Sequence, residues 1–282
     1  MSANDLFHGG DRPRPALENR LDELFRAGQA VPTRWVPRRL ILQNYWLFGY
    51  QEFHFGNGRL VLRGPNGSGK TSVLVSAVTL VLDGAKGGSR LDPFGQGGRS
   101  MAYYLLGKAE AEEGGGTFYH DDRTGYVALE FQHGGDGRFL TIGVGLRGRR
   151  LSAAATPRVD SWGFVVRDGR RVGRERPLEL TTREGVPLTR AELAERVGAG
   201  GVVVERVADY QTEVNRALFG FVEEEDYRFL MQILLALRSP KLNKELKPTD
   251  VAEILSDSLP GLDVALLERV TQIMDDIDAT RA

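Results

Sequence analysis

The residues best suited to chemistry in this chain form a glycine-rich run, GPNGSGKT, at positions 64–71. The run matches the pattern G-x-x-x-x-G-K-[ST], whose backbone amides bind the phosphates of a nucleotide. Gly64, Gly67 and Gly69 permit backbone conformations that are closed to residues with a Cβ, so successive amides can turn toward one anion. The spacing therefore predicts a phosphate-binding loop.

The two residues that end the loop have specific expected roles. Lys70 is expected to reach the β- and γ-phosphates as the catalytic lysine, and the hydroxyl of Thr71 to bind Mg²⁺. A helix that begins near Lys70 adds the partial positive charge of its N-terminus. The predicted ATP contacts are Gly64, Asn66, Gly67, Ser68, Gly69, Lys70, Thr71 and Ser72. The plainer alternative is a glycine-rich turn before a helix that happens to carry Lys-Thr.

The segments on either side supply the context that this motif needs. Leu60–Leu62 is a short apolar run suited to a buried strand. Ser72–Leu82 is an apolar stretch without glycine, suited to a buried helix. Strand, loop and helix are thus predicted in the order that a phosphate loop requires.

A second motif that nucleotide hydrolysis needs is not found. An acidic strand normally holds Mg²⁺ and is accompanied by a residue that activates water. Residues 79–83 (TLVLD) match the pattern of apolar residues followed by an aspartate, but they lie within the predicted helix that follows the loop. Residues 127–130 and 164–168 are better explained as arms of hairpins. The sequence therefore predicts half of a catalytic site.

The last residues of the chain suggest where the other half lies. Leu266, Val270, Ile273 and Ile277 follow one another at spacings of four, three and four, as in a coiled coil. Aspartates in the final turns, without a glycine cap, oppose the helix dipole. We expect the chain to stop where a long coiled coil begins. An ordinary amphipathic surface helix has the same periodicity.

Composition is typical of an intracellular globular protein. Apolar residues make up 41% of the 282 residues, enough for a core. No apolar run reaches the roughly 18 residues of a membrane span, and there is no signal-peptide pattern. The expected location is the cytoplasm, with no membrane partner. The chain has no cysteine and four scattered histidines, which argues against disulfides, a thiolate zinc site, a cysteine nucleophile or a Ser-His triad.

Basic residues gather in two places although the formal net charge is −1. The first group is Arg147, Arg149, Arg150, Arg158, Arg167, Arg170, Arg171, Arg174 and Arg176, and the second is Arg238, Lys241, Lys244 and Lys247. Arginines on strands around an Asp168-Gly169 turn could present a phosphate-binding face to DNA. Charges that protect a hairpin edge from aggregation explain them equally well.

Periodicity and turn residues predict the remaining elements. A disordered tail of 15 residues precedes an amphipathic helix at 16–26. Strands are expected at 39–43, 51–55, 59–63, 126–133, 138–145, 162–167 and 170–174, with hairpin turns at 56–58, 134–137 and 168–169. Helices are expected at 100–106, 190–196, 209–218, 223–238, 249–257 and 262–282.

These elements group into three predicted regions. Residues 1–38 form the tail and amphipathic helix, and residues 39–220 form a P-loop lobe with a glycine-rich insertion at 84–124. Residues 221–282 form a helical segment that leads into the coiled coil. An insertion of this length is more typical of a functional or flexible segment than of scaffolding.

Taken together, these motifs resemble the N-terminal half-head of the SMC, Rad50, RecF and MukB group of ATPases. The resemblance rests on Asn44, the hairpin before the loop, the string GPNGSGKTS and a basic glycine-rich segment, and it covers most of the chain. It implies an α/β P-loop NTPase fold of the ABC/SMC type, with antiparallel β hairpins and a helical C-terminal part.

Other segments look like the MukB-like branch of this group and, within it, the JetC subunits of Wadjet anti-plasmid systems. They are RLILQNYWLFGYQEFHF before the loop, LDPFGQGGRSMAYYLLG after it, residues 210–220, and YRFLMQILLALRSPKLNKEL. In a Wadjet complex the partners would be a kleisin, a winged-helix subunit and a nuclease subunit that cuts plasmid DNA.

The resemblance also implies cofactors and further residues. ATP and Mg²⁺ would be the cofactors, Arg99 would lie near nucleotide or DNA, and Gln211 would contact the Mg²⁺. A solvated loop arginine and a glutamine at a helix start are the plainer explanations of these two residues. The signature serine motif, the acidic strand and the catalytic glutamate would lie on the C-terminal head lobe of the same protein. Two such heads, as a homodimer, would sandwich ATP and drive extrusion of double-stranded DNA loops.

Three alternatives stay open. One is another SMC/Rad50/RecF-type ATPase of DNA repair or chromosome organisation. The second is a self-contained phosphotransferase such as a nucleotide kinase, against which stand the three strands expected before Gly64. The third is a DNA-binding or scaffolding module whose loop holds nucleotide only as a structural ligand.

Overall fold

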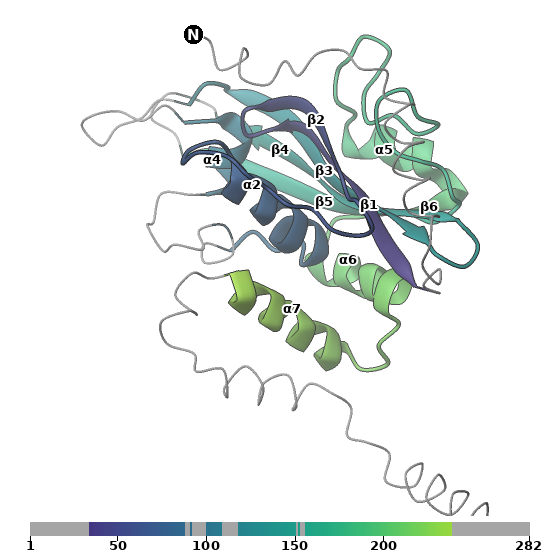
Figure 1. The fold of residues 1–282 in the computed structure, drawn as a ribbon. Helices are drawn as coiled ribbons and strands as arrows, with labels where there is room; N and C mark the ends of the chain where they lie inside the picture. Colours follow the sequence, from purple (N-terminus) through teal and green to yellow (C-terminus); the bar gives the residue numbers. More distant parts are fainter. Residues whose placement is uncertain are drawn as a thin grey trace, which may run out of the picture. The chain divides into compact units, whose positions relative to one another are not determined.

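Six strands of the N-terminal part of the chain form one antiparallel sheet (Figure 1). The computed structural model describes residues 34–87, 91, 100–108, 118–150, 152 and 156–238. The chain divides into two compact units, residues 1–221 and 222–282, which are described separately. The predicted helices at 16–26, 249–257 and 262–282, and with them the coiled coil, lie outside the described residues.

The first unit contains every strand among the described residues. Its elements are β1 (Trp35–Tyr45), β2 (Phe48–His54), α2 (Lys70–Leu74), the π-helix η2 (Val75–Leu82), α4 (Met101–Leu106), β3 (Asp122–His133), β4 (Phe139–Arg149), β5 (Arg158–Val166), α5 (Arg190–Val197), the 3-10 turn η3 (Gly198–Gly200), β6 (Gly201–Val204), α6 (Val207–Val214) and the π-helix η4 (Asn215–Phe219). The strand order across the sheet is β2-β1-β3-β4-β5-β6. The described part of the second unit holds α7 (Glu224–Arg238).

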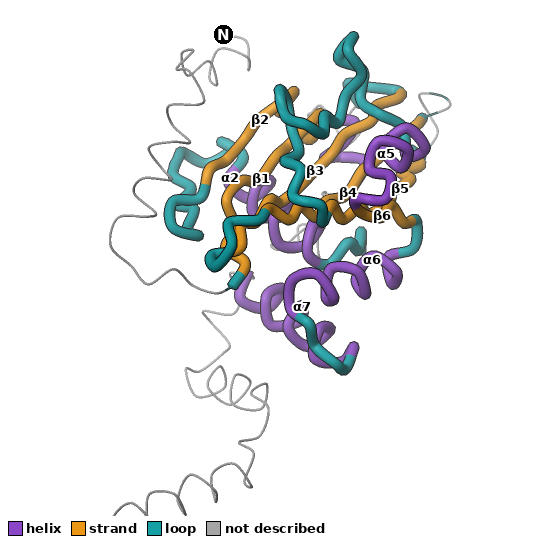
Figure 2. Tube along the Cα trace, turned by 90° about the vertical axis from the view of Figure 1, so that its right-hand side faces the viewer, coloured by secondary structure: helices purple, strands orange, loops and turns teal. Residues whose placement is uncertain are grey.

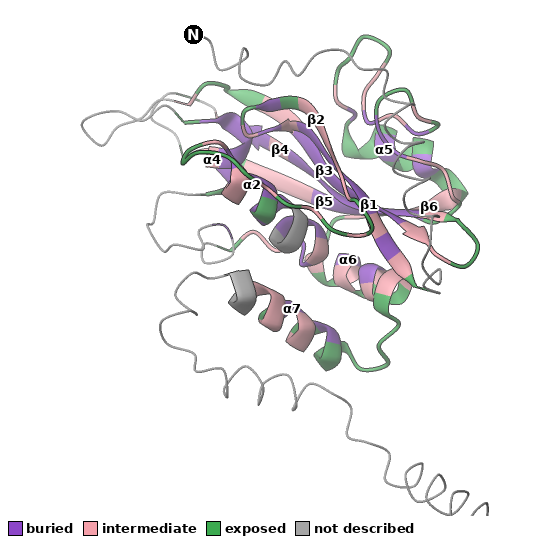
Figure 3. Ribbon diagram, viewed as in Figure 1, coloured by how far each residue is buried: buried purple, intermediate pink, exposed green. Residues whose placement is uncertain are grey.

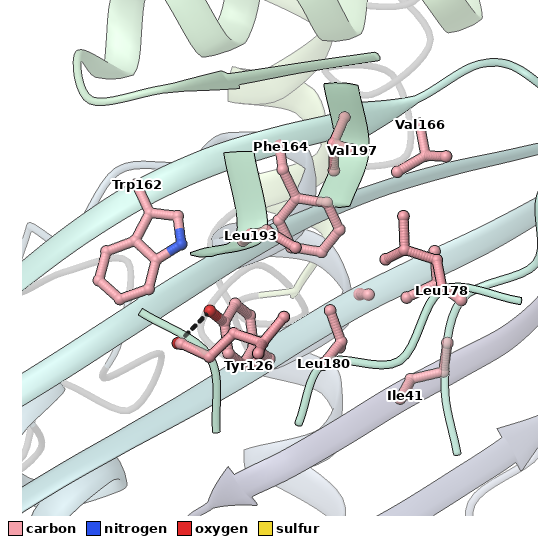
Figure 4. Close-up of a cluster of buried hydrophobic side chains, with 12 residues drawn as sticks. Ile41, Tyr126, Trp162, Phe164, Val166, Leu178, Leu180, Leu193 and Val197 are labelled. Atoms are coloured by element: carbon pink, nitrogen blue, oxygen red, sulfur yellow. Dashed lines mark hydrogen bonds between the residues drawn. The ribbon is translucent and has the colours of Figure 1, made fainter. Parts of the chain in front are cut away.

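Side chains on one face of the sheet form a buried hydrophobic cluster. Tyr126, Trp162 and Phe164 point from β3 and β5 toward Leu193 and Val197 of α5 (Figure 4). Small residues make room for the aromatic rings, because a Cβ at Gly143 or Gly145 of β4 would overlap the rings of Phe164 and Trp162. The hydroxyl of Tyr126 donates to the carbonyl of Leu188, which ties the segment before α5 to the sheet.

The opposite face of the sheet carries the helix that follows the glycine-rich loop, together with α4 and α6. The ring of Tyr210 in α6 lies so close to Gly163 of β5 that a Cβ there would overlap it. Leu106 of α4 lies similarly against Gly148 of β4. The turned view shows α5 and α6 on opposite sides of the sheet (Figure 2). With both faces covered, the inner strands β3 and β4 are mostly buried (Figure 3).

A charged network is buried within the face that α5 covers. The guanidinium of Arg39 is 1% exposed and the carboxylate of Glu130 is 0% exposed, and Arg39 Nη2 lies 2.6 Å from Glu130 Oε2. Arg39 also pairs with Glu52 of β2 at 3.0 Å, and Arg171 donates to Glu130 at 2.8 Å. Arg39 further donates to the carbonyl of Val172 at 2.8 Å. The network thus joins three strands and the segment that follows β5.

The balance of charge in this network sets the protonation of its carboxylates. Burial alone would raise the pKa of Glu130, but hydrogen bonds and charges from Arg39 and Arg171 outweigh it and lower that pKa. The same competition, with Arg39 and Tyr50 as partners, lowers the pKa of Glu52. Both carboxylates are therefore ionised at neutral pH.

One of the three predicted hairpins is confirmed, together with the predicted helices that fall within the described residues. The pairs at 126–133 with 138–145 correspond to β3 and β4, which are longer than expected, and the helices at 100–106, 190–196, 209–218 and 223–238 are present. The turn at 56–58 is also present, with Asn57 and Gly58 at positive φ and a bridge between Gly56 and Arg59.

The strand predicted at 59–63 is wrong. Only Arg59 makes a bridge, and Val61 is 76% exposed, so the apolar run before the loop is neither paired nor buried among the described residues. A run of three apolar residues cannot distinguish a buried strand from an extended connection. The chain after the turn instead leads directly into the glycine-rich loop.

The strand predicted at 170–174 is also wrong. β5 pairs with β4 and with β6, and residues 170–174 contribute only a bridge from Val172 to Leu178. Arg171 turns back onto Glu130 instead of extending a hairpin. The edge position goes to β6, a run of valines between the helices predicted at 190–196 and 209–218, where no strand is predicted.

A substitution of Glu130 tests the buried network. Glu130→Gln removes the buried carboxylate that pairs with both Arg39 and Arg171, and breaking a buried ion pair costs about 3–5 kcal/mol. We therefore expect the free energy of unfolding, measured by urea denaturation, to fall by about that amount. The matched control is Asp122→Asn, which removes an exposed ion pair with Arg147 and is expected to cost under about 1 kcal/mol. Equal, small losses in both variants would contradict a structural role for the network.

Candidate nucleotide-binding site

The glycine-rich loop has the backbone geometry that its sequence predicts. Gly64, Gly67 and Gly69 have φ angles of 156°, 81° and 87°, which residues with a Cβ rarely adopt. Gly69 is the N-cap of α2, and no side chain caps the helix there. The first amides of the helix are therefore available to an anion.

Lys70 lies back across the loop. Its Nζ donates to the carbonyl oxygens of Gly64 at 2.8 Å and Pro65 at 2.7 Å, and it lies 3.5 Å from Ser68 Oγ. All three partners are neutral oxygens. A phosphate oxygen forms stronger, charge-assisted hydrogen bonds with an ammonium group, so it can replace them.

The helix after the loop packs against β3 and β4. α2 continues without a break into η2 and ends at Asp83. Ser72 and Val73 are buried, and Ser76 Oγ donates to the Ser72 carbonyl at 2.7 Å. Residues 79–83 are thus confirmed as part of this helix and its end, which excludes them as a separate acidic strand.

The loop opens on a cavity of about 700 Å³. Its lining residues are Trp46, Leu47, Phe48, Gln51, Phe53, Leu62, Arg63, residues 64–70, and Val73. Ring centroids lie 5.7 Å apart for Trp46 and Phe48 and 5.8 Å apart for Phe48 and Phe53. One side of the cavity therefore offers amides and an ammonium group, and the other offers aromatic rings. No carboxylate is among these lining residues.

Trp46 connects the loop to the rest of the fold. It occupies the turn between β1 and β2 at a φ of 52°, an uncommon conformation for a residue with a side chain. Its amide donates to the Tyr104 carbonyl of α4, and its carbonyl accepts from Arg123 Nη1 at 3.0 Å. The indole lies over Gly69 so closely that a Cβ there would overlap it. The loop conformation thus depends on α4 and β3.

The structure brings most of the predicted loop residues together. Gly64, Asn66, Gly67, Ser68, Gly69 and Lys70 all line the cavity. Thr71 is half-buried in the first turn of α2, and Ser72 is buried in the same turn. Arg99 lies outside the described residues.

Gln211 is placed away from the loop. Its Nε2 donates to the carbonyl and to Oδ1 of Asp83, each at 2.9 Å. Asp83 ends the helix that begins at Lys70, and a helix of this length spans roughly 15–20 Å. The neighbouring Tyr210 hydroxyl donates to the Val81 carbonyl at 2.6 Å. Both residues thus fasten α6 to this helix end, and the metal contact of Gln211 stays a prediction.

The residues fit a Mg²⁺ ion that is held mainly by the nucleotide. No group of three or more His, Asp or Glu side chains that could hold a metal occurs among the described residues. Mg²⁺ is commonly held by substrate phosphates and water with one or two protein ligands. The Thr71 hydroxyl, directly after Lys70, is the ligand that this part of the chain offers.

Several lining residues were not predicted as part of the site. Trp46, Phe48 and Phe53 reach the cavity only because the turn between β1 and β2 folds over the loop. The aromatic run YWLFGYQEF was the one signal, and it does not reveal which rings face the loop.

Most arginines of the first basic group are ion-paired rather than displayed around a hairpin turn. Arg147, Arg150 and Arg167 pair with Asp122, Asp121 and Glu213, and Arg170 pairs with Asp168 in the predicted turn. Arg174 lies 4.5 Å from the centre of the Tyr50 ring. The predicted DNA-binding hairpin at 162–174 is therefore not formed, and Arg149 and Arg158 share one carboxylate, Asp160.

Two glycine substitutions distinguish the effect of the Trp46 contact on stability from the effect of backbone strain. Gly69→Ala adds a methyl group that overlaps the indole, whereas Gly67→Ala has a similar φ and open space around it. We expect Gly69→Ala to lower the free energy of unfolding by about 1–3 kcal/mol more than Gly67→Ala, as overpacking does. Urea denaturation of both variants measures the difference. Equal losses would show that Trp46 does not hold the loop.

Comparison with known proteins supports this site. A family model described as an AAA domain matches residues 39–248, which include the loop and every strand that follows it. A search of curated proteins gave no match. Within the described part of the chain, no helix is long and apolar enough to cross a membrane. Because the model matches more than half of the chain, this protein belongs to the AAA_23 family of P-loop ATPase domains, which covers the N-terminal regions of SMC/Rad50-type ATPase heads.

Proposed function

We propose that this chain is the ATP-binding half of an SMC-like motor ATPase head. The observation that carries the proposal is the phosphate loop, which has its glycines at positive φ and its lysine on neutral oxygens at the wall of a cavity. Lys70 moves from the carbonyls of Gly64 and Pro65 to the β- and γ-phosphates when ATP binds. Mg²⁺ would supply charge neutralisation to the phosphates when bound, and Thr71 would be its protein ligand.

The aromatic side of the cavity fits the nucleobase. A volume of about 700 Å³ is in the range of small-molecule pockets, which pair apolar walls with a few polar groups. When the phosphates bind at Lys70, the base lies on the side of the cavity formed by Trp46 and Phe48. The flat rings there offer a stacking surface. The loop thus binds the phosphates of ATP, and the aromatic rings pack against its base.

Hydrolysis is proposed to need a second lobe. The cavity wall holds no carboxylate that could activate water, and Lys70 alone does not supply this role. Leu47, Val61 and Leu74, which lie close in sequence to the loop or line its cavity, are exposed large hydrophobic residues. Exposed apolar side chains that form one contiguous patch mark interaction surfaces, and we propose that these three belong to such a patch. We assign this surface to the C-terminal head lobe of the same protein, which also brings the acidic strand and glutamate.

The finer assignment follows the sequence resemblance. We propose that two such heads form a homodimer that moves double-stranded DNA, in a Wadjet-type complex with kleisin, winged-helix and nuclease subunits that acts against plasmids. The strings around the loop support this assignment. Another SMC/Rad50/RecF-type ATPase of DNA repair or chromosome organisation is the alternative.

Turnover of ATP tests the composite site. We expect the 282-residue chain to hydrolyse ATP only when it is co-purified with the C-terminal region of its full-length protein. Lys70→Ala should then lower the rate by on the order of 10²-fold or more, as loss of a transition-state charge contact does.

The matched control for this assay is Lys108→Ala, at an exposed position in the segment after α4, which should leave the rate unchanged. The assay is run with and without DNA. If the chain turns over ATP unaided, the composite site is wrong, and phosphate transfer to a second nucleotide would establish the phosphotransferase alternative.

Intrinsic fluorescence tests the position of the base. The chain has three tryptophans, and only Trp46 lines the cavity, so ATP should quench its emission. Trp46→Phe should abolish the quenching while calorimetry still detects ATP binding, because phenylalanine retains a stacking surface. Trp35→Phe, at the other end of β1, should retain the quenching. Quenching that persists in Trp46→Phe would show that the base does not bind against this wall of the cavity.

A further inference from the structure

A second cavity lies beside β4 and β5, whereas the glycine-rich loop lies beside the turn between β1 and β2. Its volume is about 630 Å³, and its walls come from β4, β5, the start of α5 and the residues just before and within α6. β6 pairs with β5 only from Gly163 to Val166. The cavity lies beside the other half of β5, Arg158 to Trp162, where no strand of the described chain pairs on that side.

Cationic groups dominate the walls of this cavity. Lys86, Arg147, Arg149, Arg158 and Arg190 line it, against the two carboxylates of Asp160 and Glu205. Arg190 pairs with Glu205 at 2.7 Å, and Arg147 pairs with Asp122, which is not a lining residue. Asp160 is left to neutralise both Arg149 and Arg158, each at 3.0 Å.

The strand register places two arginines side by side with a single carboxylate, Asp160, to neutralise both. Arg149 of β4 lies directly opposite Arg158 of β5. Like charges at directly opposed positions destabilise a sheet. The side chain of Arg158 is 79% exposed, so it has donors free to turn toward the cavity. A phosphate group could accept from the remaining N–H donors of the two guanidinium groups in charge-assisted contacts and offset the excess positive charge that Asp160 leaves.

Lys86 adds a third donor from another side. Its Nζ donates to the carbonyl of Val159 at 3.0 Å, at the open edge of β5. Desolvation by the surrounding residues lowers the pKa of Lys86, although the charge of Asp160 partly opposes this. The ammonium group is thus partly removed from water and held by a neutral carbonyl, and a phosphate oxygen is a stronger acceptor than a carbonyl.

This cavity is separate from the nucleotide site. Lys86 follows the end of the helix that begins at Lys70, so that helix separates the two cavities. Arg147, Arg149 and Trp162 belong to the sheet face that α5 covers, whereas Gln51 and Phe53 line the loop cavity from the opposite face.

We propose that this cavity is a second phosphate-binding site, in which Arg149, Arg158 and Lys86 bind a phosphate group. The group belongs either to a nucleic acid backbone or to a free phosphorylated molecule. The site does not depend on ATP binding at Lys70.

The test measures phosphate binding where the first site has been removed. In a Lys70→Ala background, Arg149→Gln with Arg158→Gln is compared with a control pair, Arg138→Gln with Arg216→Gln. The control removes two exposed, ion-paired arginines of the same unit that lie outside the cavity. The probes are pyrophosphate, followed by calorimetry, and a labelled DNA duplex of about 20 base pairs, followed by fluorescence anisotropy over a salt series.

We expect the cavity pair to weaken binding of at least one probe about tenfold, and the control pair to weaken it less than about twofold. Loss of duplex binding, with the salt slope reduced by about two, identifies a nucleic acid backbone as the source. Loss of pyrophosphate binding alone identifies a free phosphorylated ligand. Lys86→Met should weaken the same probe and replaces the double variant if that variant does not fold. Equal affinities in the two pairs, or no binding of either probe, would overturn the proposal.

Discussion

The buried ion pair between Arg39 and Glu130 is the interaction on which the described fold most depends. It joins β1 to β3, and its extensions to Glu52 and Arg171 add β2 and the segment after β5. A slip of one residue in any of these strands would move a charge to the opposite face, which packs against the loop helix, α4 and α6. The pair therefore fixes the strand register, and with it the turn that places Trp46 over the loop.

The sheet separates two kinds of chemistry. One face carries the glycine-rich loop, whose helix starts at Lys70, and the rings of Phe48 and Phe53. The other face carries the buried network and, beyond it, the arginines of the second cavity. Tyr210 and Gln211 hold α6 against the far end of the loop helix. The helix thus runs between the two sites with both of its ends fixed.

The loop could be predicted from sequence because its chemistry is local. The spacing of Gly64, Gly67, Gly69 and Lys70 determines both the backbone shape and the charge that phosphates need, and the hairpin of β3 and β4 follows from alternation around a glycine turn. Elements that depend on distant partners could not be predicted. Leu60–Leu62 is apolar like a strand but has no partner among the described strands. β6 becomes an edge strand only because β5 is available to pair with it.

The remaining parts of the site depend on long-range packing. Arg39 and Glu130 lie 91 residues apart, and nothing in the local sequence of either predicts their pairing. Trp46 is similar, because its position over Gly69 depends on Tyr104 and Arg123 in segments that come much later. The family resemblance predicts that Gln211 contacts Mg²⁺. In the described fold its side chain bonds to Asp83. Local patterns thus identify the phosphate loop, and only the folded chain identifies the residues that support it.

The most direct test of the account is a crystal structure of this chain with Mg²⁺ and a non-hydrolysable ATP analogue. The account predicts that Lys70 Nζ leaves the carbonyls of Gly64 and Pro65 for the β- and γ-phosphates, with the base against Trp46. An analogue bound elsewhere, with Lys70 still on the loop carbonyls, would contradict the assignment of the loop as the nucleotide site.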